Sequence, residues 1–367
     1  MDQLWRWNRR DTWAVHPLDA GDLEKLRRLE KRTLVGAAIA GILSGSVLGG
    51  AEVLWGGRMG ELGLGMSREQ WQYSGLFLAL IVVVSGLEIL FLYWNAIRGA
   101  GRISALAGLQ LAEHETGESV ARALVRAALE LPNLREPIYG VDPYARTPQW
   151  KLTLLALGYK VKVGATSFLL RVLLRRLIGR AALRFFIPLV AIPVYATWNT
   201  IVTAWVLRQA RIRAFGPLAI RDLAQFLAAA RGRLSPECRR LIVQGVSEAI
   251  VRAGTAHPNY HLLLGRLLEV LEVPTQEVKV EWESARSAAG KLPEAECRVL
   301  LTVLLVAAII DGRVSKSESA LLEEAHHVCH RPYDRDRVVR ILKAFLHGQG
   351  VEEEWQTDSD LPPVKGK

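Results

Sequence analysis

The stretches TLVGAAIAGILSGSVLGGAEVLW (residues 33–55) and SGLFLALIVVVSGLEILFLYW (residues 74–94) decide how this chain folds. Each is as long as the roughly 20 apolar residues that a helix needs to cross the ~30 Å hydrocarbon layer of a bilayer. Each carries a single charged residue, Glu52 in the first stretch and Glu88 in the second. The sequence therefore predicts two membrane-spanning helices that form a hairpin, to which the rest of the chain is attached.

The first stretch carries small residues at every fourth position. Small side chains at this spacing let another helix backbone approach closely, so we expect them to be a helix-packing surface. The second stretch, which contains Gly75 and Gly86, is the expected partner, and self-association into a homo-oligomer through the same surface is the alternative. The residues of this small-residue stripe are Ala37, Gly41, Gly45 and Gly49.

The two acids have different predicted roles. Glu52 is expected near the outer end of the first span, at the interface. Glu88 lies deeper and is the candidate intramembrane acid, because carboxyl groups inside a membrane frequently mark proton or ion paths. The alternative is a protonated or hydrogen-bonded residue that only packs.

Basic residues are distributed unevenly around the hairpin. Residues 1–32 are rich in Lys and Arg and read as an amphipathic lead-in, whereas the connecting loop has only Arg58 and Arg68. Arg98 and Arg102 follow the second span. The positive-inside rule therefore predicts that both ends of the hairpin, and the bulk of the chain, lie in the cytoplasm.

The composition excludes several classes of protein. The formal net charge of +10 comes from basic residues close to the apolar blocks, which favours contact with anionic lipids over nucleic acid. The sequence has no zinc-finger spacing, Gly-rich phosphate loop, HExxH or GxSxG motif. The 3 cysteines are odd in number and widely separated, which is typical of a reducing compartment.

A third block, residues 151–217, is both apolar and basic. Its first half could lie on an anionic membrane face as a basic amphipathic helix, or be a cytoplasmic helix with a leucine-rich core face. Its second half, residues 185–207, is uncharged and long enough to be a third span, but Pro188 and Pro193 interrupt it. Since both of its flanks are basic, we expect a membrane-abutting or re-entrant helix pair with the chain staying cytoplasmic. The candidate lipid-facing residues are Arg171, Arg175, Arg176, Arg180 and Arg184.

Two segments of the C-terminal region share one pattern. LAQFLAAARGRLSPECRRLIVQGVSEAI begins at Leu223, and LTVLLVAAIIDGRVSKSESALLEEAHHV begins at Leu301. Each predicts a helix, a Gly-Arg turn and a second helix, and this suggests an internal duplication. The expected turn residues are glycines with positive φ (Gly232 and Gly312), serine N-caps (Ser235 and Ser315), Pro236 at a first helical position and Glu318 in a capping box.

Two family resemblances accompany these patterns. LLVAAIIDGRVSKSESALLEEA (residues 304–325) resembles the repeated signature of tellurite-resistance TerB-like domains, all-helical bundles whose acidic residues are suggested to bind metal. Asp311, Gly312 and Glu318 match that signature, whereas the earlier copy has Arg231 and Cys238 at the acidic positions. IPLVAIPVYATWNTIVTAWVLRQARIRAFGP (residues 187–217) is loosely similar to the closing helix of EcsC-like bacterial membrane-associated families.

Several residues are candidate metal ligands. Asp311 and Glu318 could give oxygen ligands to a divalent cation, but Ca²⁺ and Mg²⁺ need more oxygens than two carboxylates supply, so a structural turn is the alternative. His326 and His330 lie one turn apart beside Cys329, and His257 and His261 form a second pair. Neither pair completes a zinc site. Cys238 and Cys297 are expected to be small buried apolar residues.

The sequence thus predicts an all-α bacterial protein of the cytoplasmic (inner) membrane, with a two-span transmembrane hairpin, a cytoplasmic helical region and a C-terminal TerB-like helical bundle. Its expected function is a non-enzymatic interaction or sensing module with an unidentified protein partner. A small membrane transport or permeation component that uses Glu88 and the third apolar block is the alternative. The expected segments are residues 1–32, 33–95, 96–150, 151–217, 218–350 and a mobile tail at 351–367.

Overall fold

The computed structural model describes residues 18–55, 58, 67–107, 137–150, 152–153 and 187–349. The predicted all-α fold is confirmed, since these residues contain no β-strand beyond one isolated bridge between Ile138 and Val141. Residues 1–17, Arg171 to Arg184 and residues 351–367, on which three of the predictions fall, lie outside the described residues. The helices are α1 (Ala20–Trp55), α2 (Arg68–Leu106), α6 (Ile187–Ala230), η3 (Arg231–Arg233), α7 (Pro236–Ala253), α8 (Pro258–Leu271), η4 (Thr275–Glu277), α9 (Trp282–Ala289), α10 (Glu294–Ile309), α11 (Lys316–Val328) and α12 (Arg335–Leu346).

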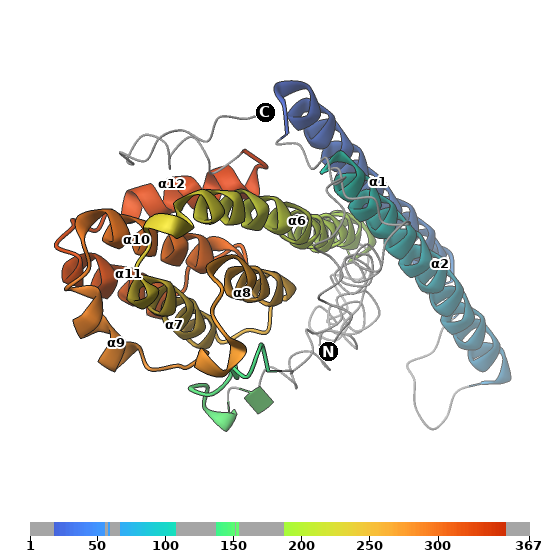
Figure 1. Ribbon diagram of the computed structural model, residues 1–367. Coiled ribbons are helices and arrows are strands. Elements are labelled where there is room, and N and C mark those ends of the chain that lie inside the picture. Colours follow the sequence, from blue (N-terminus) through green and yellow to red (C-terminus); the bar gives the residue numbers. More distant parts are fainter. Residues whose placement is uncertain are drawn as a thin grey trace.

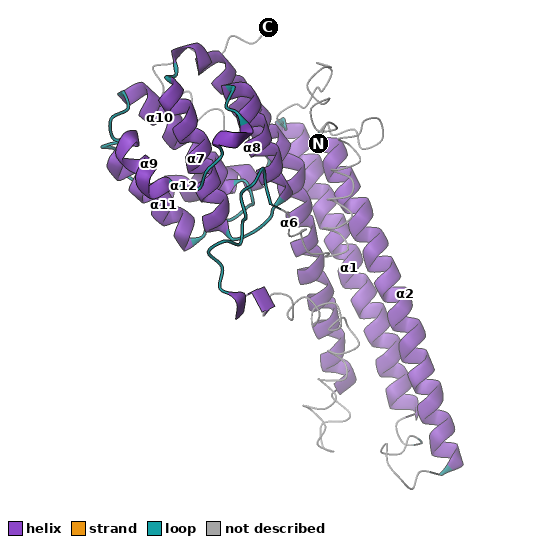
Figure 2. Ribbon diagram, turned by 60° about the horizontal axis from the view of Figure 1, so that its bottom comes forward, coloured by secondary structure: helices purple, strands orange, loops and turns teal. Residues whose placement is uncertain are grey.

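Helices α1 and α2 form a long hairpin that projects from a helical domain (Figures 1 and 2). The helices are joined near the domain by a hydrogen bond of 2.8 Å from Asn95 Nδ2 to the carbonyl oxygen of Thr33. Both are long and apolar enough to cross a membrane. Their outward faces expose large apolar side chains, including Leu43 and Leu54 of α1 and Leu87 and Leu90 of α2. A surface of this kind needs an apolar solvent, which indicates membrane association.

An arginine packs on an aromatic ring at each end of the apolar stretch of α2. Arg98 lies over the ring of Trp94 near the domain, and Arg58 lies over the ring of Tyr73 at the loop end. Tyr73 and Trp94 are 21 positions apart, which corresponds to a rise of about 32 Å in an α-helix. This separation is close to the ~30 Å thickness of a hydrocarbon layer, with aromatic residues at both boundaries.

The second half of the third apolar block is one continuous helix. Helix α6 has 44 residues and contains both Pro193 and Pro217. Each proline removes one backbone donor, but the helix continues through both positions. Figure 2 shows its first half beside α1 and α2 and its second half inside the domain. The expected boundary at residues 217 and 218 therefore falls within α6.

The small-residue stripe is buried, but its partner differs from the expected one. A Cβ atom on Gly41 would lie only 2.7 Å from the backbone nitrogen of Ala196, and one on Gly45 would lie 3.2 Å from Cα of Ile192. The stripe therefore packs on α6. The prediction that α2 is its partner, through Gly75 and Gly86, is wrong, because a Cβ atom on either of these glycines would meet no atom within 4 Å.

The domain is built around the second half of α6. Helices α7, α8, α10 and α12 pack against α6 or one another, with α9 and α11 on the outside of α7 (Figure 1). Trp282 and Tyr260 are among the largest fully buried side chains. The segment 137–150 crosses this domain as an ordered connection, attached by an ion pair of 2.5 Å between Arg146 and Glu248.

Candidate functional site

The turn between α10 and α11 has the predicted local structure. Gly312 has φ +83°, a conformation that favours glycine. The Ser315 side chain accepts a hydrogen bond of 3.1 Å from the Glu318 backbone N–H, and the Glu318 carboxylate accepts one of 2.8 Å from the Ser315 N–H. The predicted capping box is therefore confirmed.

The corresponding turn between α6 and α7 differs. The expected positive φ at Gly232 is wrong, because the chain there forms the 3₁₀ helix η3. Ser235 is the predicted N-cap and Pro236 opens α7. The missing carboxylate comes from α10, since Glu296 accepts hydrogen bonds of 2.6 Å from Ser235 N–H and 2.8 Å from Ser235 Oγ. Because Glu296 is distant in sequence from Ser235, the residues around the turn could not predict this capping contact.

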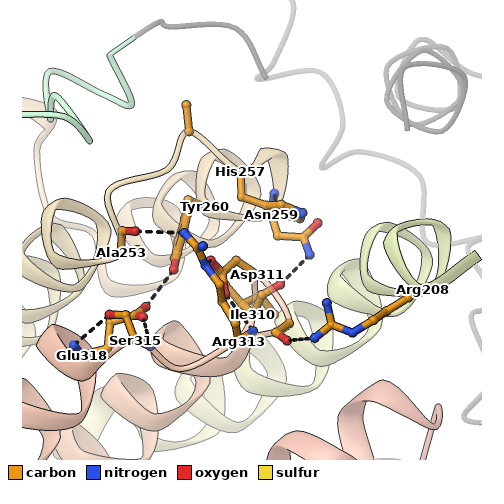
Figure 3. A network of polar contacts seen from close by, with 12 residues as sticks. Arg208, Ala253, His257, Asn259, Tyr260, Ile310, Asp311, Arg313, Ser315 and Glu318 are labelled. Atoms are coloured by element: carbon orange, nitrogen blue, oxygen red, sulfur yellow. Dashed lines mark hydrogen bonds and ion pairs between the residues drawn. The ribbon is translucent and has the colours of Figure 1, made fainter. Parts of the chain in front are cut away.

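Asp311 and Arg313 close the loop that follows α10. Asp311 accepts hydrogen bonds of 3.0 Å from the backbone N–H of Arg313 and 3.2 Å from its Nε. The other end of the guanidinium donates to the carbonyl oxygen of Ala253 at 3.2 Å (Figure 3). Arg313 therefore neutralises Asp311 and ties the loop to the end of α7.

Glu318 and Asp311 are buried close together beside Tyr260, which is itself fully buried. The Tyr260 hydroxyl donates a hydrogen bond of 3.1 Å to Glu318 (Figure 3). Burial, and then repulsion from Asp311, raise the pKa of Glu318 to about 7. Burial also raises the pKa of Asp311, although Arg313 opposes this shift. The pair therefore has a higher proton affinity than two solvated carboxylates.

These carboxylates do not fit a cation site. Their oxygens already accept hydrogen bonds from Arg313, Ser315 and Tyr260. In the described part of the chain no group of three or more His, Cys, Asp and Glu side chains has a geometry suited to a metal ion. The arrangement favours the structural alternative, in which Asp311 and Glu318 shape the turn.

The same loop is attached directly to α6. Arg208 Nη2 donates to the carbonyl oxygen of Gly312 at 2.5 Å. Asn259 Nδ2, from α8, donates to the carbonyl oxygens of Ile310 at 2.8 Å and of Ile212 at 3.0 Å, so it bridges the loop and α6. Figure 3 shows the hydrogen bonds of Arg208 and Asn259 meeting the loop at neighbouring points. This part of α6 is therefore in direct contact with Gly312 and is joined through Asn259 to Ile310.

A second buried polar contact lies among the apolar helices. Asn199 Nδ2 on α6 donates a hydrogen bond of 2.8 Å to Glu88 Oε1 on α2, and both residues are buried. Glu88 thus joins α2 to α6. Asn199 is a polar residue in an otherwise apolar stretch of sequence, and this pattern could have identified it as the partner of Glu88. The contact with Glu88 is made by Asn199, in the first half of α6. The contacts with the loop and with Asn259 are made by Arg208 and Ile212, where the second half begins.

The histidine pairs do not form sites. His326 Nδ1 lies 2.7 Å from the carbonyl oxygen of Leu322, and the ring packs edge-on against Tyr333. His257 is the buried N-cap of α8, and burial together with Arg213 and Arg313 lowers its pKa well below the usual value. Its ring is therefore neutral. Cys238, Cys297 and Cys329 are all buried and carry free thiols, as expected for Cys238 and Cys297.

No protein-family model, no curated protein and no solved structure matches this chain. The TerB-like and EcsC-like resemblances therefore stay predictions, and the function has to be argued from the geometry of α6 and its two polar contacts.

Proposed function

We propose that this chain is a membrane-anchored, non-enzymatic interaction or sensing module in which α6 connects a bilayer-embedded helix bundle to a cytoplasmic helical domain. One observation carries the proposal: a single helix packs on the hairpin with its first half and forms the centre of the domain with its second half. A change in the bundle therefore has a direct route to the domain surface, where a protein partner would bind. The TerB-like resemblance suggests envelope or metal stress as the trigger.

In this proposal α6 adds a third helix to the two candidate spans α1 and α2. Because Gly45 meets Ile192, the first residue of α6 lies near the level of Gly50, more than halfway along the apolar part of α1. Trp198, Ile201 and Trp205 of α6 are exposed and follow one face of the helix. In this proposal residues 187–207 are a third membrane-embedded helix, in place of a segment that stays at the cytoplasmic surface.

The test disturbs the bundle and measures the domain. Gly41→Leu would insert a side chain where the backbones of α1 and α6 meet. We expect it to raise the hydrogen-exchange rate of residues 308–318 at least about tenfold in the full chain held in lipid nanodiscs, because loss of about 1.4 kcal/mol of local stability corresponds to a factor of ten. Gly50→Leu is the matched control, because a Cβ atom on Gly50 meets nothing within 4 Å.

Two results would contradict the proposal. Unchanged exchange in residues 308–318, together with increased exchange in α1, would show that α6 is a passive tether. Complete release of the unmodified chain from membranes by alkaline carbonate would show that the hairpin does not span a bilayer.

A second candidate function is a small transport or permeation component, and the buried contact between Glu88 and Asn199 favours it. Polar side chains in the apolar layer are costly and often line a path. Proteoliposomes would then show a proton or cation flux that is lost in Glu88→Gln and kept in Glu52→Gln. Equal flux in both variants, or none in the unmodified chain, would reject this alternative.

A further inference from the structure

The domain end of the hairpin carries a ring of exposed cations. Arg27 and Lys31 lie one turn apart on α1, with Arg32 beside them, and Arg98 and Arg102 lie one turn apart on α2. All are exposed. We call Arg27, Lys31, Arg32, Arg98 and Arg102 the basic rim.

The basic rim lies just beyond the apolar surface, within about two helical turns of its edge. The hydrogen bond between Asn95 and Thr33 puts the start of the α1 apolar stretch level with the end of the α2 stretch. Arg98 and Arg102 are four and eight residues past Trp94, hence about 6 Å and 12 Å along the helix axis. Lipid headgroups occupy roughly 5–7 Å on each side of the hydrocarbon layer, so the rim extends through this zone and just above it.

Acidic neighbours do not neutralise the basic rim. Glu24 pairs with Arg28 at 2.5 Å, and Glu30 pairs with Arg211 of α6 at 3.0 Å. In the part of the chain that the structure describes, none of the five rim cations forms an ion pair. Arg98 instead lies over the ring of Trp94, at 5.0 Å from its centroid, which holds its charge at the interface.

We propose that the basic rim binds the phosphate groups of anionic phospholipids in the leaflet that faces the domain. The inference rests on the proposed function, since it needs the hairpin to span a bilayer, and it names a specific lipid class as partner. Charge complementarity supports it, because five exposed cations, none of which forms an ion pair within the described ranges, face a layer that holds the anionic headgroups. Among the described residues, the loop end of the hairpin carries fewer cations, Arg58 and Arg68, and Glu69 lies next to Arg68.

The experiment measures which lipids contact the protein. The full chain is reconstituted in phosphatidylcholine bilayers with spin-labelled phosphatidylglycerol or spin-labelled phosphatidylcholine, and electron paramagnetic resonance gives the fraction of each that is motionally restricted. We expect an about tenfold preference for phosphatidylglycerol at low salt, falling at least about threefold in the Arg98→Gln/Arg102→Gln variant. The control is Arg233→Gln/Arg240→Gln, which removes the same charge from exposed positions beyond the domain end of α6.

Each outcome decides the question. A preference that falls in the rim variant and not in the control supports the proposal. Equal preference for both lipids in the unmodified chain overturns it, and an equal fall in both variants assigns the effect to net charge instead. If no restricted lipid is detected for either probe, the hairpin is not in the bilayer and the proposed function fails. Circular dichroism confirms that both variants keep their helices.

Discussion

The two halves of α6 are packed by different means. Residues 187–207 contact α1 through glycine positions and expose Trp198, Ile201 and Trp205. Residues 208–230 are enclosed by the domain, where Ile212, Phe215 and Leu223 are buried in the continuous core. One helix therefore has an apolar face directed outward at one end and inward at the other.

Under the proposed function, this difference follows from the solvent that each half of α6 meets. In water, burying apolar side chains is favourable by about 25 cal/mol per Å², so the domain half is stabilised by enclosing them. In a bilayer that gain is absent, and helices associate through close backbone approach and hydrogen bonds. Gly41 and the contact between Asn199 and Glu88 supply these in the bundle. We therefore expect a substitution in the domain half of α6 to lower the free energy of unfolding more than an equivalent substitution in the bundle half.

The largest effect is expected at the turn that attaches the domain to α6. Gly312→Ala would place a Cβ atom 2.2 Å from Cδ1 of Ile212, at a residue with φ +83°. Backbone strain and overpacking together should lower the free energy of unfolding by about 2–4 kcal/mol. Denaturant unfolding of the full chain in detergent micelles, followed by circular dichroism, measures this loss.

The aligned glycine of the other turn is the control. A Cβ atom on Gly232 would meet nothing within 4 Å, and its φ is not positive. Gly232→Ala should therefore change the free energy of unfolding by no more than about 0.5 kcal/mol. A similar loss in both variants would show that the two turns are equivalent after all, and that the contact with Ile212 carries no special strain.

The next effect compares the two buried asparagines. Asn259→Ala would leave the carbonyl oxygens of Ile212 and Ile310 without their side-chain donor, and should cost about 2–3 kcal/mol. Asn199→Ala removes one hydrogen bond in the bundle, where such bonds contribute about 0.6 kcal/mol on average.

Melting temperatures of the full chain in nanodiscs would rank the two variants. A larger loss for Asn199→Ala than for Asn259→Ala would break the comparison, because it would make the hydrogen bond to Glu88 the stronger determinant of how α6 is held.

Much of the local structure could be read from the sequence. The hairpin, the Ser235 and Ser315 caps, and the positive φ of Gly312 follow from residue types at fixed short spacings. These features depend on a few neighbouring residues, which is why pattern and propensity suffice. The prediction of a positive φ at Gly232 was wrong because this turn forms a 3₁₀ helix. The Ser235 cap that follows the turn is bound by Glu296, which is far away in the sequence.

The long-range partners could not be predicted. The stripe of Gly41 and Gly45 showed that a helix would approach, but any smooth apolar helix satisfies that pattern. The helix that packs on Gly41 and Gly45 is α6, which is distant in sequence, and not α2 as predicted. Pro193 likewise argued for an interruption, yet a proline early in a helix supported by packing along its length is tolerated. The link from Glu318 to Tyr260 joins α11 to α8 and leaves no trace in either segment.

An effect smaller than those at Gly312 and Asn259 depends on pH and concerns Glu318. Its pKa in the fold, about 7, exceeds the ordinary value of 4.5, so the folded state holds the proton more tightly than the unfolded chain. The contribution of Glu318 to stability is therefore full below pH 4.5 and declines as the pH rises towards 7. Glu318→Gln keeps groups able to bond Ser315 and Tyr260 and cannot ionise. Relative to the unmodified chain it should gain of order 1–2 kcal/mol between pH 4.5 and 8.

Tyr260→Phe sharpens this test, because it removes the donor that lowers the pKa of Glu318. The pH range over which stability is lost should then extend to higher pH in Tyr260→Phe. The Glu318→Gln/Tyr260→Phe double variant should lack the part of this loss that Glu318 causes. Melting temperatures of the full chain at several pH values measure all four proteins. A stability difference between Glu318→Gln and the unmodified chain that does not vary with pH would mean that Glu318 acts only as a cap. The attachment of the domain half of α6 to this loop would then depend on Arg208 and Asn259 and not on the protonation of Glu318.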